Sequence, residues 1–345
     1  IDVLNQLISK QQNIRDYLSG INASDNKQYK LIIHNAAKPA FISSISHNTK
    51  YPIFMITSTH EKAKYFFDQI ANWSQAVDAS ILPELDVLPY QKGIPDPAIT
   101  HERIKILDNL LNRGQDDKTP ILIASMHSVI QNIIEAREYV INSYHVKKGQ
   151  KVNPIELYGI CQSIGYRTSD GVENTGFISR RGDIFDIFPP PSDRPLRIEL
   201  FGNEVESIRF FDPDNQRSMD KIEEVIITPA NDLISSNRSL ERYASTLKSL
   251  DFTNCKREVK DQMEHEIEMF LSGQRPQKQS LFSNILNKGS IIDYLTEETL
   301  IIIEDKKVIE SEFNHIDAEY LRLKNEKIEN GEIPQDIPAF YHDWN

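Results

Sequence analysis

Lys38 stands where a phosphate-binding loop would place its lysine, between an apolar run and a helical pattern in LIIHNAAKPA, residues 31–40. Such a loop needs glycines that let backbone N–H groups approach phosphate, a lysine for the outer phosphates and a hydroxyl for Mg²⁺. Here the glycines and the hydroxyl are missing, and Pro39 removes one N–H donor. The pattern predicts either a degenerate nucleotide loop in which only Lys38 survives, or an ordinary turn between a strand and a helix.

A second apolar run, LIII at residues 300–303, ends in Glu304 and Asp305. In an ATP site, such a strand ends in Asp-Glu: the aspartate holds Mg²⁺ and the glutamate positions the attacking water. The two acids stand in the reverse order here, so we interpret Glu304 and Asp305 as a degenerate Walker B strand end. Together the two altered halves predict descent from an ATPase without present activity. We therefore assign no catalytic residue, no metal and no bound cofactor.

The strand LRIELF, residues 196–201, gives a binding signal instead. Alternation along a strand sends its side chains to two faces: Leu196, Ile198 and Leu200 to one, and Arg197, Glu199 and Phe201 to the other. If the apolar set faces the core, Phe201 lies on the solvent face with Arg197. Arg181 of the preceding strand can join them. An exposed Phe beside Arg is typical of a protein-binding hot spot.

Two alternatives stay open for this face. In one, Phe201 packs under a loop and the arginines are merely solvated. In the other, the Arg-Phe surface binds DNA, although Glu199, Glu204 and Glu206 crowd it with negative charge. The net charge of −12, from 39 basic and 51 acidic residues, also repels DNA at long range.

Two kinds of sheet must position these residues. Strands expected at 30–34, 51–59, 76–90, in the first part of 119–134 and at 299–308 alternate with helices expected at 61–73, 100–114 and 309–327. Such alternation predicts a parallel sheet covered on both faces. Residues 176–190, 195–212 and 221–230 have a period of two and turn residues, which predicts an antiparallel sheet. We expect an α/β domain in two parts, 1–140 and 233–345, with an α+β domain inserted at 141–232; residues 1–20 and about 235–295 are expected to be helical.

Bulk composition places the chain among cytoplasmic globular proteins. It has no apolar run of about 18 residues, the length that would span a membrane, and its amino terminus lacks the pattern of a signal peptide. Cys161 and Cys255 have no metal-like spacing, so we expect reduced thiols. No membrane partner is expected.

Three segments carry a family resemblance: LPELDVLPYQKGIPDPAITHERIKILDNL, GFISRRGDIFDIFPPPSDRPLRIELFGNEVESIRFFDPDNQRS and IIDYLTEETLIIIED. They resemble the amino-terminal part of bacterial transcription-repair coupling factors (Mfd), a part similar to the repair helicase UvrB. The resemblance covers most of the chain, is densest at 81–111 and 176–230, and thins over 235–285. It implies a degenerate P-loop NTPase-like fold made of domains 1a, 2 and 1b. We assign domains 1a, 2 and 1b to residues 1–140, 141–232 and 233–345, the bounds that the order of expected strands and helices indicates.

The resemblance implies a non-catalytic module that recruits UvrA, linking stalled RNA polymerase to nucleotide excision repair. The family's UvrA contacts fall on Arg181, Arg197 and Phe201, with Arg180 and Glu199 as further candidates. The translocation motor, the contacts with RNA polymerase and DNA, and carboxy-terminal domains that mask domain 2 belong to other parts of the full-length factor, so we expect a fragment. The alternative is a UvrB-like helicase half with residual nucleotide or DNA binding. The short loop around Tyr90 disfavours a UvrB-like clamp on damaged DNA.

Overall fold

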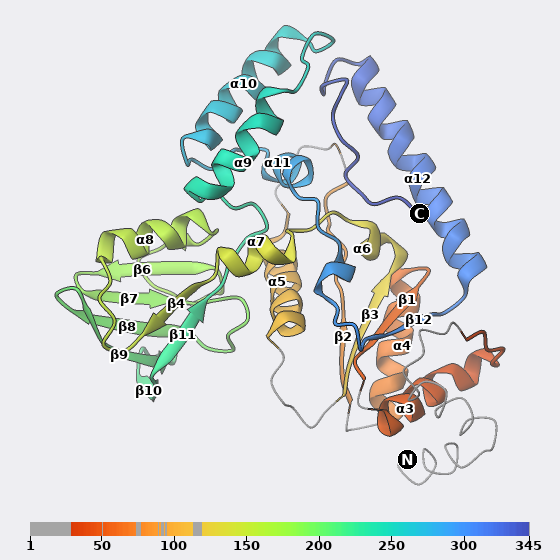
Figure 1. Cartoon of the computed structure of the whole chain (residues 1–345), viewed down its shortest axis with the longest axis horizontal. Helices are drawn as coiled ribbons and strands as arrows, with labels where there is room; N and C mark the ends of the chain where they lie inside the picture. Colours follow the sequence, from red (N-terminus) through yellow and green to blue (C-terminus); the bar gives the residue numbers. More distant parts are fainter. Residues whose placement is uncertain are drawn as a thin grey trace.

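The computed structural model describes residues 29–344, except 50, 74–76, 89, 91, 92, 94 and 113–118. The helix expected at residues 1–20 lies outside this range. Figure 1 shows two sheets on either side of helix α5 (Pro97–Leu111), with a group of helices above them. Among the described residues, no helix is long and apolar enough to cross a membrane, and no group of three or more His, Cys, Asp or Glu could hold a metal ion.

The first sheet is parallel, as predicted, and has four described strands. They are β1 (Ile53–Thr57), β2 (Val77–Ile81), β3 (Thr119–Ser125) and β12 (Leu300–Ile303), in the order β12-β1-β3-β2. Since β12 pairs with β1, the chain returns to this sheet after forming the antiparallel one. Helices α3 (Lys38–Asn48) and α4 (His60–Trp73) pack on one face. The opposite face packs against α5 and α6 (Met126–Ile130).

The strand predicted at residues 30–34 is wrong. Residues 29–34 pair with no described strand, and Ile32 is 96% exposed. A short 3-10 helix, η1 (Asn35–Ala37), follows and leads into α3. The apolar side chains of this run suit a pleated sheet, but a strand also needs a neighbour to accept its backbone hydrogen bonds. The expected layout of the loop and helix around Lys38 is kept without that strand.

The second sheet has six strands and forms most of the inserted unit. They are β5 (Arg167–Thr168), β6 (Phe177–Arg181), β7 (Ile184–Ile187), β8 (Leu196–Phe201), β9 (Glu204–Phe211) and β10 (Ser218–Ile222). Consecutive strands are neighbours and antiparallel, except that β5 runs parallel to β6. Helix α8 (Pro154–Ser163) covers the inner face, where Leu157 and Cys161 are buried. A small antiparallel pair, β4 (Tyr144–Lys147) and β11 (Glu224–Ile227), flanks it.

Helices α9 (Asn237–Lys248), α10 (Arg257–Leu271) and α11 (Gln279–Leu286), in the helical region expected after residue 235, form a core of their own. The 3-10 helix η2 (Ile291–Tyr294) instead packs into the core shared by the two sheets, and α12 (Lys306–Glu329) follows β12. Ile333, Ile337 and Phe340 of the last segment are buried in the same cluster as α9, α10 and α11. The short helix α7 (Ala136–Ile141) joins the parallel sheet to β4. This packing gives the turn-rich tail a fixed place in the fold.

Candidate functional site

The outer face of the six-stranded sheet gathers polar side chains from four neighbouring strands. Cross-strand register sets Ser179, Asp186, Arg197 and Arg209 in one row and Arg181, Ile184, Glu199 and Ser207 in the next. Residues paired across strands share a face of the sheet, and so do residues two apart along a strand. We call these two rows, with Phe201 beyond them at the end of β8, the outer face.

The predicted alternation of buried and more exposed side chains along β8 is confirmed. Leu196, Ile198 and Leu200 are buried, whereas Phe201 is 80% exposed. The strand ends at a two-residue turn in which Gly202 has φ +62°, the left-handed conformation that glycine adopts without strain. Because the Phe201 ring is so exposed at the end of a hairpin, it contributes little to the core. It is instead available for contact with another molecule.

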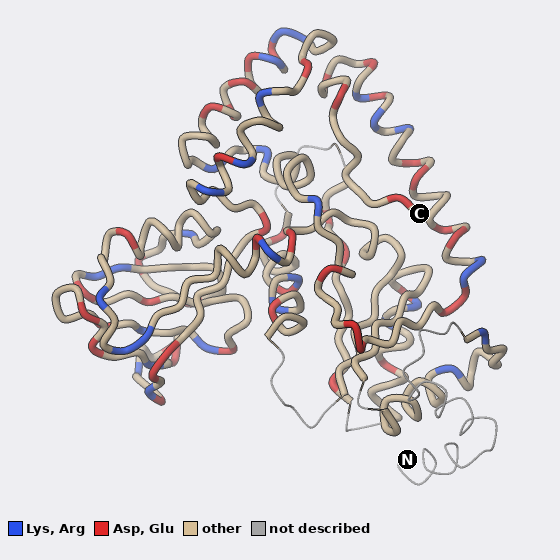
Figure 2. Tube along the Cα trace, viewed as in Figure 1, with Lys and Arg blue, Asp and Glu red and all other residues tan. Residues whose placement is uncertain are grey.

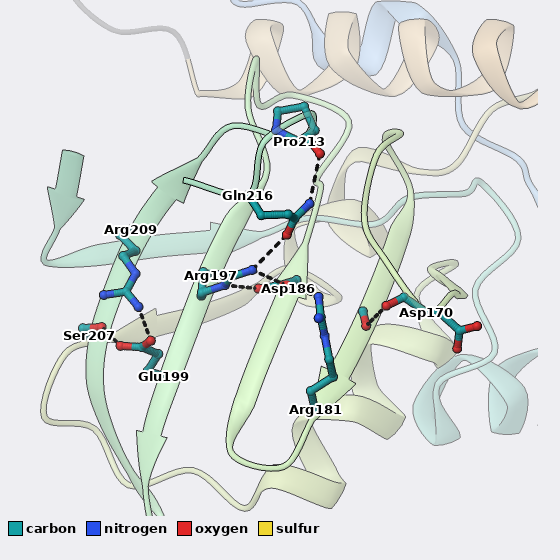
Figure 3. A network of polar contacts seen from close by, with 10 residues as sticks. Asp170, Arg181, Asp186, Arg197, Glu199, Ser207, Arg209, Pro213 and Gln216 are labelled. Carbon is teal, nitrogen blue, oxygen red and sulfur yellow. Dashed lines mark hydrogen bonds and ion pairs between the residues drawn. The ribbon is translucent and has the colours of Figure 1, made fainter. Parts of the chain in front are cut away.

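Asp186 is the buried acid at the centre of the face (Figure 3). Its side chain is 2% exposed and accepts hydrogen bonds from Arg197 Nε at 2.7 Å and Nη2 at 2.8 Å. Arg181 Nη2 approaches the same carboxylate at 3.4 Å. The hydrogen bond to Asp186 raises the pKa of Arg197 above its ordinary value, although burial works in the opposite direction. Two arginines on one acid leave the group with a net positive charge.

Arg197 is also held by two further neighbours. Its Nη2 donates to Gln216 Oε1 at 3.1 Å, and its guanidinium carbon lies 4.7 Å from the centre of the Phe211 ring. Bidentate pairing with a carboxylate and stacking on an aromatic ring both suit the planar guanidinium. The side chain is only 15% exposed. Of the three predicted contact residues, Arg197 is therefore on the expected face but firmly held within it.

Arg181 and Arg180 point to opposite faces of β6. Arg181 belongs to the outer face and is 59% exposed. Arg180 pairs in register with Phe185 and stacks over its ring at 5.4 Å, and its Nε donates to Gly182 O at 3.1 Å. Because Phe185 is buried on the inner face, Arg180 is not brought together with the other candidates.

Glu199 lies on the outer face but is already engaged. It accepts a hydrogen bond from Ser207 Oγ at 2.8 Å and forms an ion pair with Arg209 (Figure 3). Its charge is thus largely offset within the sheet. This internal pairing reduces the negative charge that the sequence suggested would crowd the face.

Sequence reasoning missed Asp186 and Gln216. Asp186 interrupts the apolar strand IFDI, and alternation would have placed its side chain on the outer face. Gln216 lies in the turn between β9 and β10 with φ +60° and reaches Arg197 only because that turn folds back over the sheet. The first residue had a readable signal, whereas the second depended on the three-dimensional path of a loop.

Lys38 and Glu304, which the sequence predicted to be parts of a degenerate nucleotide site, meet at the carboxyl edge of the parallel sheet. Lys38 Nζ lies 2.8 Å from Glu304 Oε1, and Lys62 Nζ lies 3.0 Å from Oε2 of the same carboxylate. Burial alone would raise the pKa of Glu304, but the hydrogen bonds from the two lysines outweigh it and the pKa is lowered. Asp305 caps α12 by accepting from Lys307 N and Val308 N. Lys38 and Lys62 thus pair with Glu304, whereas Asp305 serves as a helix cap.

Tyr90 is buried rather than presented to solvent. Its ring stacks on Phe340 with centroids 4.3 Å apart, and burial raises its pKa to about 12. An aromatic side chain held in this way cannot stack on a nucleic-acid base without first leaving the core. The expectation that this loop lacks a DNA clamp stays a prediction, with Tyr90 now placed inside the fold.

Comparisons with known proteins agree with the sequence resemblance. Residues 144–233 match the family model described as the UvrB interaction domain. Transcription-repair-coupling factors from Bacillus subtilis, Myxococcus xanthus and Escherichia coli are 25%, 34% and 26% identical over 98%, 49% and 70% of this chain. The matched part is 29%, 14% and 20% of those proteins' lengths, so the chain spans about a third or less of each relative. The chain is therefore similar over 98% of its length to the transcription-repair-coupling factor of Bacillus subtilis, and residues 144–233 match the UvrB interaction domain.

Proposed function

We propose that the chain is a non-catalytic module that recruits UvrA through the outer face of its inserted sheet. The observation that carries the proposal is that Phe201, 80% exposed, and Arg181, 59% exposed, lie on the same outer face of the antiparallel strands β6 to β8. Aromatic and arginine side chains dominate binding energy at protein interfaces. Their presence inside the segment that matches a UvrB interaction domain supports a repair protein of this kind as the partner.

Each residue has a distinct part in this recognition. Phe201 is the apolar anchor and requires a pocket on the partner. Arg181, whose contact with Asp186 is long at 3.4 Å, can turn to a carboxylate of the partner. Charged groups of this kind mainly set orientation and association rate, whereas the buried ring supplies affinity. The partner surface should therefore combine an apolar pocket with acidic residues.

The wider role follows from the relatives and is part of the proposal. In a transcription-repair-coupling factor, such a module would link a stalled RNA polymerase to nucleotide excision repair. We assign contacts with RNA polymerase and DNA, the ATP-driven motor and the masking of the outer face to other parts of a longer protein. For this chain we propose a degenerate P-loop-like α/β fold that needs no nucleotide.

The rival function, a UvrB-like helicase half, finds less support. The lysine that would hold phosphate is paired with Glu304, and the aromatic of the short loop is buried. For DNA, Figure 2 shows Lys and Arg alternating with Asp and Glu along α10 and α12 rather than forming one basic stripe. Binding to DNA without sequence preference needs such a stripe, and it is strongly salt-dependent.

The proposal is tested by measuring the affinity of purified UvrA for this chain and for Arg181→Ala with Phe201→Ala. We expect binding by the unchanged chain and its loss in the double variant. Arg180→Ala is the matched control, because it removes an exposed arginine from the same strand but from the opposite face. Equal binding by the double variant and the unchanged chain would rule out the outer face as the UvrA site.

A further inference from the structure

The guanidinium group of Arg197 is held in place by several contacts within the sheet. Nε and Nη2 both donate to Asp186, Nη2 donates to Gln216, and the guanidinium covers the Phe211 ring. Within the described residues, Nη1 makes no hydrogen bond to the protein. The group therefore has one engaged edge and one free edge, and the free edge is the part that a partner can meet.

Asp186 determines which edge is engaged. The carboxylate is almost fully buried on β7, directly opposite Arg197 on β8 and within 3.4 Å of Arg181 on β6. A charge at this depth is stable only with its partners in place, so its position is fixed. A free arginine, by contrast, samples many rotamers. One buried acid thus sets the direction of guanidinium groups on the strands at both of its sides (Figure 3).

We propose that Asp186 is a positioning residue of the outer face. It holds Arg197 with Nη1 directed away from the engaged edge and keeps Arg181 beside it, so the pair meets a carboxylate of the partner already ordered. This inference rests on the proposed function, because it concerns the same surface. Ordering a side chain before binding lowers the entropy that association must overcome. Asp186 itself makes no contact with the partner.

The first test compares Asp186→Asn with Asp220→Asn, a change at an exposed acid of β10 that is not part of the outer face. Both remove one negative charge from the same sheet at nearly constant side-chain volume, but only the first removes the carboxylate that holds Arg197. If the sheet acted through net charge alone, both variants would bind an acidic partner more tightly. Positioning predicts that Asp186→Asn weakens UvrA binding by about tenfold, while Asp220→Asn does not weaken it.

The second test asks whether Asp186 acts through Arg181 and Arg197. We expect Asp186→Asn to have no further effect on UvrA affinity when Arg181→Met and Arg197→Met are both already present, because no guanidinium beside Asp186 is then left to orient. A merely structural role would instead lower stability in both backgrounds. Binding is measured at a temperature at which thermal unfolding shows every variant to be folded. Unchanged affinity in Asp186→Asn, or an equal loss in the two backgrounds, would overturn the inference.

The two proposals fail in different ways. If the unchanged chain does not bind UvrA, the proposed function is wrong. If it binds, and Arg181→Ala with Phe201→Ala abolishes binding while Asp186→Asn does not alter it, only the positioning role is wrong.

Discussion

Lys38 and Glu304 are 266 positions apart in the sequence, yet their side chains form an ion pair of 2.8 Å. The pair joins the first turn of α3 to the end of β12, where a phosphate-binding loop and its acidic strand would meet around a nucleotide. Lys62 reaches the second oxygen of the same carboxylate at 3.0 Å, and the Glu304 side chain is 6% exposed. A carboxylate of the protein therefore neutralises the positive charge of Lys38.

The free energy of unfolding at acidic pH should depend on Glu304. Its pKa is lower in the folded chain than the ordinary 4.5, so the folded state binds fewer protons. The stabilisation is complete above pH 4.5 and is lost as the pH falls through the lowered folded value. Glu304→Gln should cost about 2 kcal/mol at neutral pH and flatten the profile below pH 4.5, as measured by urea unfolding. Glu310→Gln, an exposed acid of α12, is the control and should leave the profile unchanged.

The same ion pair predicts no functional nucleotide site. Mg-ATP should not raise the melting temperature of the chain, and Lys38→Met should not alter the response, because binding to the folded state alone would stabilise it. Differential scanning fluorimetry over a series of nucleotide concentrations measures both. A nucleotide-dependent rise that disappears in Lys38→Met would favour the helicase-like alternative.

Phe201 and Arg181 should differ in how they affect UvrA binding. Phe201→Ala should weaken it by about 2 kcal/mol, or roughly 30-fold, with little change in the free energy of unfolding because the ring is 80% exposed. Arg181→Ala should act mainly on the association rate and reduce its dependence on salt. Surface plasmon resonance at several ionic strengths separates the two effects. A large loss of stability in Phe201→Ala would mean that the ring supports the fold instead.

Patterns within one strand were readable from the sequence, whereas pairings between strands were not. The two faces of β8 follow from alternation alone, and Leu196, Ile198 and Leu200 are buried as predicted. The Asp186–Arg197 pair needs the register of β7 against β8, which no local pattern supplies. The strand expected around Ile32 fails for the related reason that apolar side chains do not provide a pairing partner. Lys38 and Glu304 were each singled out, but only the parallel arrangement of β12 explains why they meet.

His101 connects the parallel-sheet domain to the inserted sheet and should make their packing sensitive to mild acid. It extends from α5, its Nδ1 lies 2.8 Å from Thr175 Oγ1, and a Cβ added to Gly176 would fall 2.4 Å from its Nε2. Burial, and then the positive charge of Arg167, lower its pKa from 6.5 to about 4. The folded state thus resists protonation of the imidazole.

The direction in which stability changes with pH follows from the difference in proton binding at His101 between the folded and the unfolded chain. Between pH 6.5 and about 4 the unfolded chain binds a proton at His101 that the folded chain does not, so stability falls as the pH falls through this window. His101→Gln, which keeps a polar group near Thr175, should remove this fall in stability with pH. The further loss of stability below pH 4.5 that comes from Glu304 should remain. Urea unfolding at closely spaced pH values measures the slope, and His315→Gln, an exposed histidine of α12, is the matched control. A slope that persists in His101→Gln but disappears in His315→Gln would contradict the assignment, since the titrating group would then lie on α12 and not between α5 and β6.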